Sequence, residues 1–309
     1  MSENQRTMDL FLFRLVLEPQ AGKGSLGEIE VSRQDLLIKL LATSPQLPSG
    51  AYKVFLTSKI EQISSSGFYF KAGVQSLKTG AKFDSEKKDF VEAETEIADF
   101  SHCIYDKNLQ LLAIENKSGL SSPKTLANRL ASAIENIKNT DGYKSLSPEE
   151  KMLFSNSICK SRQVYETNEF IKILKNSYKI SKFTIVMLLP NPANFKDTIY
   201  TPFNELMEDT QASGGQITIE NKDEGLEPNR LVDLSHDIGA YGAGASAKVQ
   251  DAAESKERTI RLDKRENAAK ATLSLPQTMF TVDFKEYSKD FLKVITDKFK
   301  QIHESNKKE

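Results

Sequence analysis

The chain has 309 residues, a formal net charge of −1 and 39% hydrophobic residues, so it is long enough to bury one large core or two smaller ones. The near-zero charge excludes a protein coated with basic residues, and the longest apolar run, Phe183–Leu189, is far shorter than the roughly 20 residues of a membrane span. Only Cys103 and Cys159 are present and no secretory leader is recognisable, so we expect a reduced, cytoplasmic protein that is not membrane-embedded.

The first third of the chain has the alternating and apolar patterns of antiparallel strands. We expect strands over residues 8–17, 51–60, 67–74 and 90–97. Between the first two, Ser32 predicts the N-cap of a helix that ends near Leu41. In the last strand, Glu92, Glu94 and Glu96 share one face. Because such side chains are parallel rather than convergent, we interpret them as a solvated or partner-facing surface.

The stretch from Phe100 to Asn136 predicts a hairpin followed by a helix. Apolar runs at residues 102–105 and 111–114 flank a short polar turn, as in a β-hairpin. After the hairpin, Ser122 supplies a hydroxyl N-cap, and Pro123 occupies the first helical position, where its missing N–H costs nothing. We therefore expect a helix that begins at Pro123 and packs its apolar face on the sheet.

A possible catalytic signature lies inside this stretch. Asp106, followed by Glu115 and Lys117, resembles the signature of nucleases in which two carboxylates hold Mg²⁺ and a lysine helps to activate water. If the expected turn forms, Asp106 pairs near Leu111 and Glu115 falls opposite His102. The two carboxylates then lie roughly 13 Å apart at about 3.3 Å per residue, too far to share one ion. We interpret His102 beside Glu115 as a structural cross-strand contact.

We expect a domain boundary at a polar, turn-forming stretch near residue 138. This gives a β-rich α+β domain over residues 1–138 and a mixed α/β domain over residues 139–309. The predicted fold class is α+β. Its N-terminal half is antiparallel and β-rich with packed helices, and its C-terminal half is mixed α/β, contains a buried strand at residues 183–189 and ends in a long amphipathic helix.

Positive charge is concentrated in the second half of the chain, whereas residues 84–99 are acidic. Residues 138–182 carry a surplus of bases, and four more bases lie between residues 258 and 265. Such bases could contact phosphates, although a solvated helix face explains the surplus as well. The candidate nucleic-acid-binding residues are Lys172, Lys175, Lys179, Lys182, Arg258, Arg261, Lys264 and Arg265.

The long amphipathic helix is expected over residues 283–303. Its apolar stripe predicts packing on the core, and a homodimer interface is the alternative. The interface candidates are Phe284, Phe291, Ile295 and Phe299. We interpret the glycine-rich tract at residues 241–248 as flexible, either a mobile loop over a partner or a linker.

The β-rich first half of the chain and four features that follow together resemble a known family. The four features are the hairpin that runs into a capped helix at residues 106–136, the buried strand ending in Leu189-Pro190, the stretch 216–225 and the terminal helix ending at residues 298–302. Their order resembles the RexA exclusion sensors of lambdoid phages and related bacterial phage-defence proteins. The resemblance implies a homodimer that binds double-stranded DNA with little sequence preference, senses or signals phage infection, carries no catalytic signature and takes no cofactor.

Three hypotheses follow from these patterns. The first is a non-enzymatic, homo-oligomeric DNA-binding regulator in anti-phage defence, with a partner protein from the same operon. The second is a Mg²⁺-dependent nuclease that uses Asp106, Glu115 and Lys117 in another strand pairing. The third is a pure protein-interaction scaffold of a defence complex. The first hypothesis assigns neither catalytic nor metal-binding residues.

Overall fold

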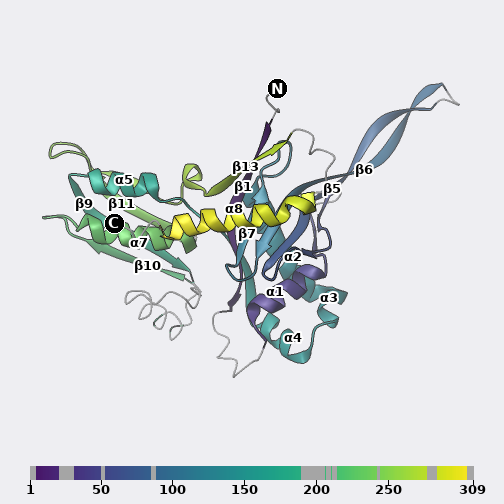
Figure 1. Cartoon of the computed structure of the whole chain (residues 1–309), viewed down its shortest axis with the longest axis horizontal. Coiled ribbons are helices and arrows are strands. Elements are labelled where there is room, and N and C mark those ends of the chain that lie inside the picture. The colour runs from purple at the N-terminus through teal and green to yellow at the C-terminus, as the bar shows by residue number, and fades with distance from the viewer. Residues whose placement is uncertain are drawn as a thin grey trace.

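The computed structural model describes residues 5–20, 31–49, 53–84, 88–188, 206, 210, 214–241, 244–276 and 284–304. Within these ranges the protein has the predicted α+β fold, and the strands of both of its sheets pair antiparallel (Figure 1). No helix in the described part of the chain is both long enough and apolar enough to span a membrane.

The first sheet contains nine of the described strands. Its order is β13-β1-β7-β6-β5-β3-β2, with β4 also paired to β5 and β8 also paired to β1. The bounds are β1 (Gln5–Pro19), β2 (Gln46–Pro48), β3 (Lys53–Thr57), β4 (Glu61–Gln62), β5 (Gly67–Asp84), β6 (Asp89–Asp106), β7 (Leu111–Glu115), β8 (Ser157–Gln163) and β13 (Lys270–Pro276).

The second sheet has four described strands in the order β10-β9-β11-β12. They are β9 (Lys179–Leu188), β10 (Gly214–Glu220), β11 (Gly244–Gln250) and β12 (Arg258–Arg261). The helices are α1 (Arg33–Ala42), α2 (Pro123–Asn136), α3 (Asp141–Lys144), α4 (Pro148–Ser155), α5 (Asn168–Asn176), α7 (Pro228–Tyr241) and α8 (Phe284–Glu304).

Both faces of the first sheet are covered, as the apolar β1 sequence predicts. Leu12 and Phe13 point to opposite faces of β1 and are both almost fully buried. Phe13 joins a core with the apolar sides of α1, α2 and α4, whereas Leu12 joins a second core with α8. Figure 1 shows α8 lying across the sheet and reaching α7 beside the second sheet, where Lys298 of α8 pairs with Glu166 at 3.0 Å.

Local signals place the helix starts where the sequence predicts them. The hydroxyl of Ser32 accepts the N–H of Asp35 at the start of α1, and the hydroxyl of Ser122 accepts the N–H of Thr125 at the start of α2. Each bond satisfies one of the N–H groups that the first helical turn leaves without a partner. Pro123 occupies the first turn of α2, as expected.

The predicted hairpin between β6 and β7 is confirmed in its register. Asp106 pairs with Leu111, and Cys103 pairs with Ile114. Gln110 closes the turn with a positive φ of 50°, and its N–H bonds to the carbonyl of Lys107. Leu111 to Glu115 are all buried, because β7 lies in the interior of the sheet.

The expected boundary at residue 138 does not separate the two sheets. Residues 139–163 belong with the first sheet, since β8 pairs with β1 from Phe13–Gln163 to Pro19–Ser157 and Leu153 and Phe154 of α4 fill the same core as α2. The chain leaves this sheet only after Gln163 and returns to it with β13 and α8. The polar turn near residue 138 therefore connects α2 to helices that pack on the same sheet.

The β5–β6 pair is longer than the predicted strands at residues 67–74 and 90–97. It runs from Gly67–Asp106 to Asp84–Asp89, whereas β3 pairs only with residues 72–76 of β5 and β7 only with residues 103–106 of β6. Figure 1 shows the outer part as a two-stranded ribbon that projects from the body. The acidic stretch of residues 90–97 is thus part of this ribbon.

The predictions for the glycine-rich tract and for the strand at residues 183–189 differ in extent from the observed elements. The glycine-rich tract at residues 241–248, interpreted as flexible, lies largely within β11, where Ala245 and Ala247 are buried under α7. Small side chains suit this position because a helix packs closely on the strand. The buried strand expected over residues 183–189 is part of β9, and Leu189 and Pro190 lie outside the described residues.

Candidate nucleic-acid interface

The predicted cationic residues whose side chains the structure describes do not form one patch. Lys172 and Lys175 are exposed on α5, which packs with α7 on the apolar face of the second sheet. Lys182 of β9 and Arg261 of β12 lie on the opposite face, because they alternate with the buried residues Phe183 and Ile260 along their strands. Sequence spacing within the basic region does not reveal this division.

Several of these cations already have an acidic neighbour. Arg258 holds Asp251 through two hydrogen bonds of 2.7 and 2.9 Å, and this contact lowers the pKa of the Asp251 carboxyl. Lys179 donates to the carbonyl oxygens of Lys222 and Asp223, which fixes the turn after β10. The remaining pairs are Lys182–Glu220 (2.6 Å), Arg261–Asp263 (3.3 Å) and Lys264–Glu266 (3.3 Å). The side chain of Arg265 lies outside the described part.

One face of the second sheet is covered by no helix that the structure describes. Its residues align in three rows across the strands, and we call them the open face. The rows are Glu220-Lys182-Lys248-Thr259, Thr218-Thr184-Ser246-Arg261 and Gln216-Val186-Gly244. These residues are exposed or half-buried, whereas alternating residues such as Phe183, Ile185 and Ala247 are buried in one core with α5 and α7.

The chemistry of the open face suits phosphate groups. Hydroxyl and cationic side chains supply most phosphate contacts in nucleic-acid complexes, and this face carries both. Thr184 and Thr218 are hydrogen-bonded to each other at 3.1 Å, which aligns two hydroxyls on neighbouring strands. None of the open-face residues is aromatic, so the face offers no platform on which bases could stack.

The charge of the open face is incompletely balanced. Lys182 and Lys248 stand directly opposite each other in the β9–β11 register, a cross-strand pairing of like charges that is destabilising. Glu220 pairs with Lys182 and more distantly with Lys222, at 3.8 Å, and the contact with Lys182 lowers the pKa of the Glu220 carboxyl. Lys248 is exposed and forms no ion pair with any described residue. An anion bound between the two lysines would relieve their repulsion.

The nuclease-like residues do not converge. Asp106 accepts hydrogen bonds from the Ser66 hydroxyl at 3.0 Å and the Leu109 N–H at 2.9 Å, so it stabilises the turns at its end of the hairpin. Glu115, at the other end of β7, accepts the backbone N–H of His102 at 3.1 Å. Both carboxylates are buried, and their separation along the hairpin is the one that the predicted turn implies. No group of metal-ligating residues occurs in the described ranges.

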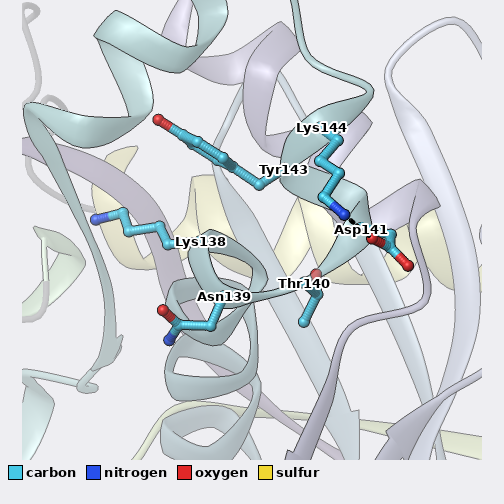
Figure 2. A pocket seen from close by; sticks show the side chains of 6 residues that line it. All are labelled: Lys138, Asn139, Thr140, Asp141, Tyr143 and Lys144. Carbon is cyan, nitrogen blue, oxygen red and sulfur yellow. Dashed lines mark hydrogen bonds and ion pairs between the residues drawn. The ribbon is translucent and has the colours of Figure 1, made fainter.

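A surface hollow of about 490 Å³ is lined by the turn that follows α2 and by α3, as Figure 2 shows. The basic side chains that line the hollow form ion pairs with residues of the same chain. Lys144 pairs with Asp141 at 2.7 Å, while Lys138 pairs with Glu135 at 2.8 Å and lies over the Phe154 ring. We assign no ligand to it, because these internal contacts account for its charges. The lining residues are Lys138, Asn139, Thr140, Asp141, Tyr143 and Lys144.

The predicted dimer-interface stripe packs inside the chain. Phe291, Ile295 and Phe299 of α8 are 5%, 1% and 4% exposed, and they fill the second core of the first sheet. The side chain of Phe284 lies outside the described part. An apolar stripe alone does not distinguish a partner copy from the sheet of its own chain. The default expectation of core packing accounts for these three residues.

Comparison with known proteins assigns this chain to no group: no family model and no curated protein sequence matches it. The function must therefore be argued from the structure. Sequence reasoning missed Lys248 and the hydroxyl rows of the open face. The alternation of Gln216, Thr218 and Glu220 with isoleucines was the available signal, because it predicts a strand with one polar face.

Proposed function

We propose that this protein binds the phosphate backbone of double-stranded DNA through the open face of its second sheet, without cleaving it. The observation that carries the proposal is the cross-strand pairing of Lys182 with Lys248 on a polar face that no described helix covers. A phosphate would neutralise the repulsion between these lysines. The separated positions of Asp106 and Glu115 favour binding over metal-dependent cleavage.

The ion pairs on this face do not prevent phosphate binding. Exposed pairs such as Lys182–Glu220 and Arg261–Asp263 contribute only about 0 to 1 kcal/mol, so a phosphate can replace the carboxylate at small cost. With Lys182, Lys248 and Arg261 as contacts, the logarithm of the binding constant should fall with the logarithm of salt concentration with a slope of about −2.7. Binding should therefore be weak at physiological salt and clear at low salt.

The absence of aromatic residues from the open face favours duplex over single-stranded nucleic acid. Proteins that bind single strands stack bases on aromatic side chains, whereas duplex phosphates are held by lysine, arginine and hydroxyl groups. Thr184, Thr218 and Ser246 supply such hydroxyls in one row beside Arg261. We expect little sequence preference, because phosphate contacts carry no sequence information.

The test is a fluorescence-anisotropy titration of a labelled DNA duplex over a series of salt concentrations. Lys248→Ala and Arg261→Ala should each weaken binding and each make the salt slope shallower by about 1. Lys172→Ala is the matched control, because it removes an exposed lysine from α5 on the other side of the sheet. Wild-type protein that fails to bind duplex even at low salt would refute the proposal.

A role in phage exclusion is a further proposal, supported by the resemblance to RexA-like sensors. The same resemblance supports a homodimer and a partner from the same operon. Because the α8 stripe is packed within the chain, a dimer would use another surface. Phage plating efficiency on cells that carry wild-type protein or the Lys248→Ala variant tests this role: equal plating on both, and on cells without the protein, would reject it.

A further inference from the structure

Two lysine ammonium groups converge on one aromatic ring at the base of the β5–β6 ribbon. Lys71 Nζ lies 4.8 Å from the centroid of the Phe100 ring, and Lys117 Nζ lies 4.9 Å from it. Lys71 is on β5, Phe100 is on β6, and Lys117 follows β7, so three strands position the group. The distance between the two nitrogens cannot exceed the sum of these two distances. That upper limit is close to the Debye length of roughly 8 to 10 Å, so salt does not fully screen one charge from the other.

Neither lysine forms an ion pair with a carboxylate of the described residues. Lys117 Nζ donates to the carbonyl oxygen of Phe100 at 3.3 Å, and each ammonium keeps donors for another acceptor. Glu115 is close along β7, but it is 6% exposed and accepts the N–H of His102. The ring face attracts both cations, yet it removes neither charge.

The charges of both lysines also act on His102, which lies beside the Phe100 ring. His102 packs edge-on against Phe100, with ring centroids 5.4 Å apart, and stands opposite Lys71 in the register. Its pKa is lowered from 6.5 to about 4, first by burial and then by the charges of Lys71 and Lys117. A neutral His102 adds no third positive charge at neutral pH, and Lys71 and Lys117 remain the cations of the group.

Gly73 keeps a side chain away from this position. It stands directly opposite Phe100 in the β5–β6 register, where a Cβ would lie 2.0 Å from the carbonyl oxygen of Asp99 and 2.7 Å from Phe100 Cα. The strands therefore approach too closely for any larger residue. As a result, the Phe100 ring has Lys71 as a neighbour on β5 but no side chain directly across from it.

We propose that Lys71 and Lys117, positioned by the Phe100 ring, form a binding site for a phosphate group. Two ammonium groups that pair with no described carboxylate and keep donors to spare match a phosphate, which lysine binds as a point charge. The site lies on the first sheet, whereas the open face belongs to the second sheet. It is independent of the proposed function, because it uses different residues. Its ligand is either a free phosphate ester or a phosphate of a nucleic-acid backbone.

The test measures the pKa of His102 by NMR in the presence of increasing concentrations of inorganic phosphate. Sodium chloride at matched ionic strength is the control for screening. Saturable phosphate binding should raise the pKa of His102, because it neutralises the two lysines. Lys71→Gln and Lys117→Gln should each raise this pKa without phosphate and weaken phosphate binding at least tenfold. His102→Gln identifies the signal, and Lys59→Gln is the exposed matched control.

Two further measurements complete the test. Circular dichroism establishes that each variant is folded, and a short DNA duplex replaces phosphate in a second titration with wild type, Lys71→Gln and Lys117→Gln. Loss of duplex affinity in these variants identifies a backbone phosphate as the ligand, whereas loss of phosphate binding alone identifies a free phosphate ester. A phosphate effect no larger than that of sodium chloride would overturn the proposal. So would a phosphate effect that is unchanged in a folded double variant carrying Lys71→Gln and Lys117→Gln.

Discussion

Replacing His102 by glutamine tests how the base of the ribbon responds to acid. His102 is half-buried, and its Nδ1 lies 2.8 Å from the hydroxyl oxygen of Tyr69. Burial, followed by the charges of Lys71 and Lys117, lowers the pKa of His102 from 6.5 to about 4. Because the folded state binds a proton at His102 less readily than the unfolded state, protonation of His102 favours unfolding. The contribution of His102 to stability is therefore complete above pH 6.5 and is lost as the pH falls from 6.5 toward 4.

The magnitude follows from the two pKa values of His102. Their difference corresponds to at most about 3.5 kcal/mol at about 1.4 kcal/mol per pH unit, and partial solvent access reduces this to about 2 kcal/mol. Between pH 7 and pH 4, the free energy of unfolding of the wild type should therefore fall by about 2 kcal/mol more than that of His102→Gln. Other titrating groups are present in both proteins and cancel in the difference.

Urea denaturation at a series of pH values measures this difference. The glutamine amide can still bond to the Tyr69 hydroxyl, so the substitution removes the titration while keeping a polar partner. The variant should be less stable than the wild type at pH 7, because it loses ring packing against Phe100. Its stability should depend less on pH. Two stability curves that run parallel from pH 7 to pH 4 would refute the reasoning.

Further substitutions probe the fold. Gly73→Ala should lower the free energy of unfolding by about 2 kcal/mol or more, because its Cβ would lie 2.0 Å from a carbonyl oxygen of β6; thermal denaturation close to that of the wild type would contradict the register. Arg162→Met removes the ion-pair partner of the Glu18 carboxylate, which is 2% exposed, and should cost about 3 to 5 kcal/mol in urea denaturation. The double variant with Glu18→Leu should recover most of that loss, and failure to recover any would show that the cost lies elsewhere. Ser147→Ala breaks the capping box with Glu150 and should cost about 1 kcal/mol, and an unchanged denaturation midpoint would exclude the cap as a stabilising contact.

Features that depend on neighbouring residues were predictable from the sequence. The caps at Ser32 and Ser122 and the pairing of Asp106 with Leu111 each follow from side-chain and turn chemistry within a few residues. The fold class was predictable too, because strand patterns dominate the first half. The β8 pairing with β1 was not, since it joins Phe13 to Gln163 and no local signal in β8 specifies a partner so far away.

The site was only partly predictable. Lys182 and Arg261 were identified as candidates, but their face depends on which strands pair and on a register shift at Lys248/Val249. Lys172 was grouped with them because it is near in sequence, although α5 carries it to the other side of the sheet. Charge counts along a chain cannot separate the two faces of a sheet, because that separation arises from strand alternation and helix packing.

The central claim is that opposed lysines on an uncovered sheet face bind duplex phosphates. The most direct measurement compares the salt dependence of duplex binding for the wild type, for the double variant Lys182→Ala with Lys248→Ala, and for Lys172→Ala. We expect the double variant to reduce the magnitude of the slope by about 2, and Lys172→Ala to keep the wild-type slope. Equal slopes for the double variant and the wild type would contradict this claim.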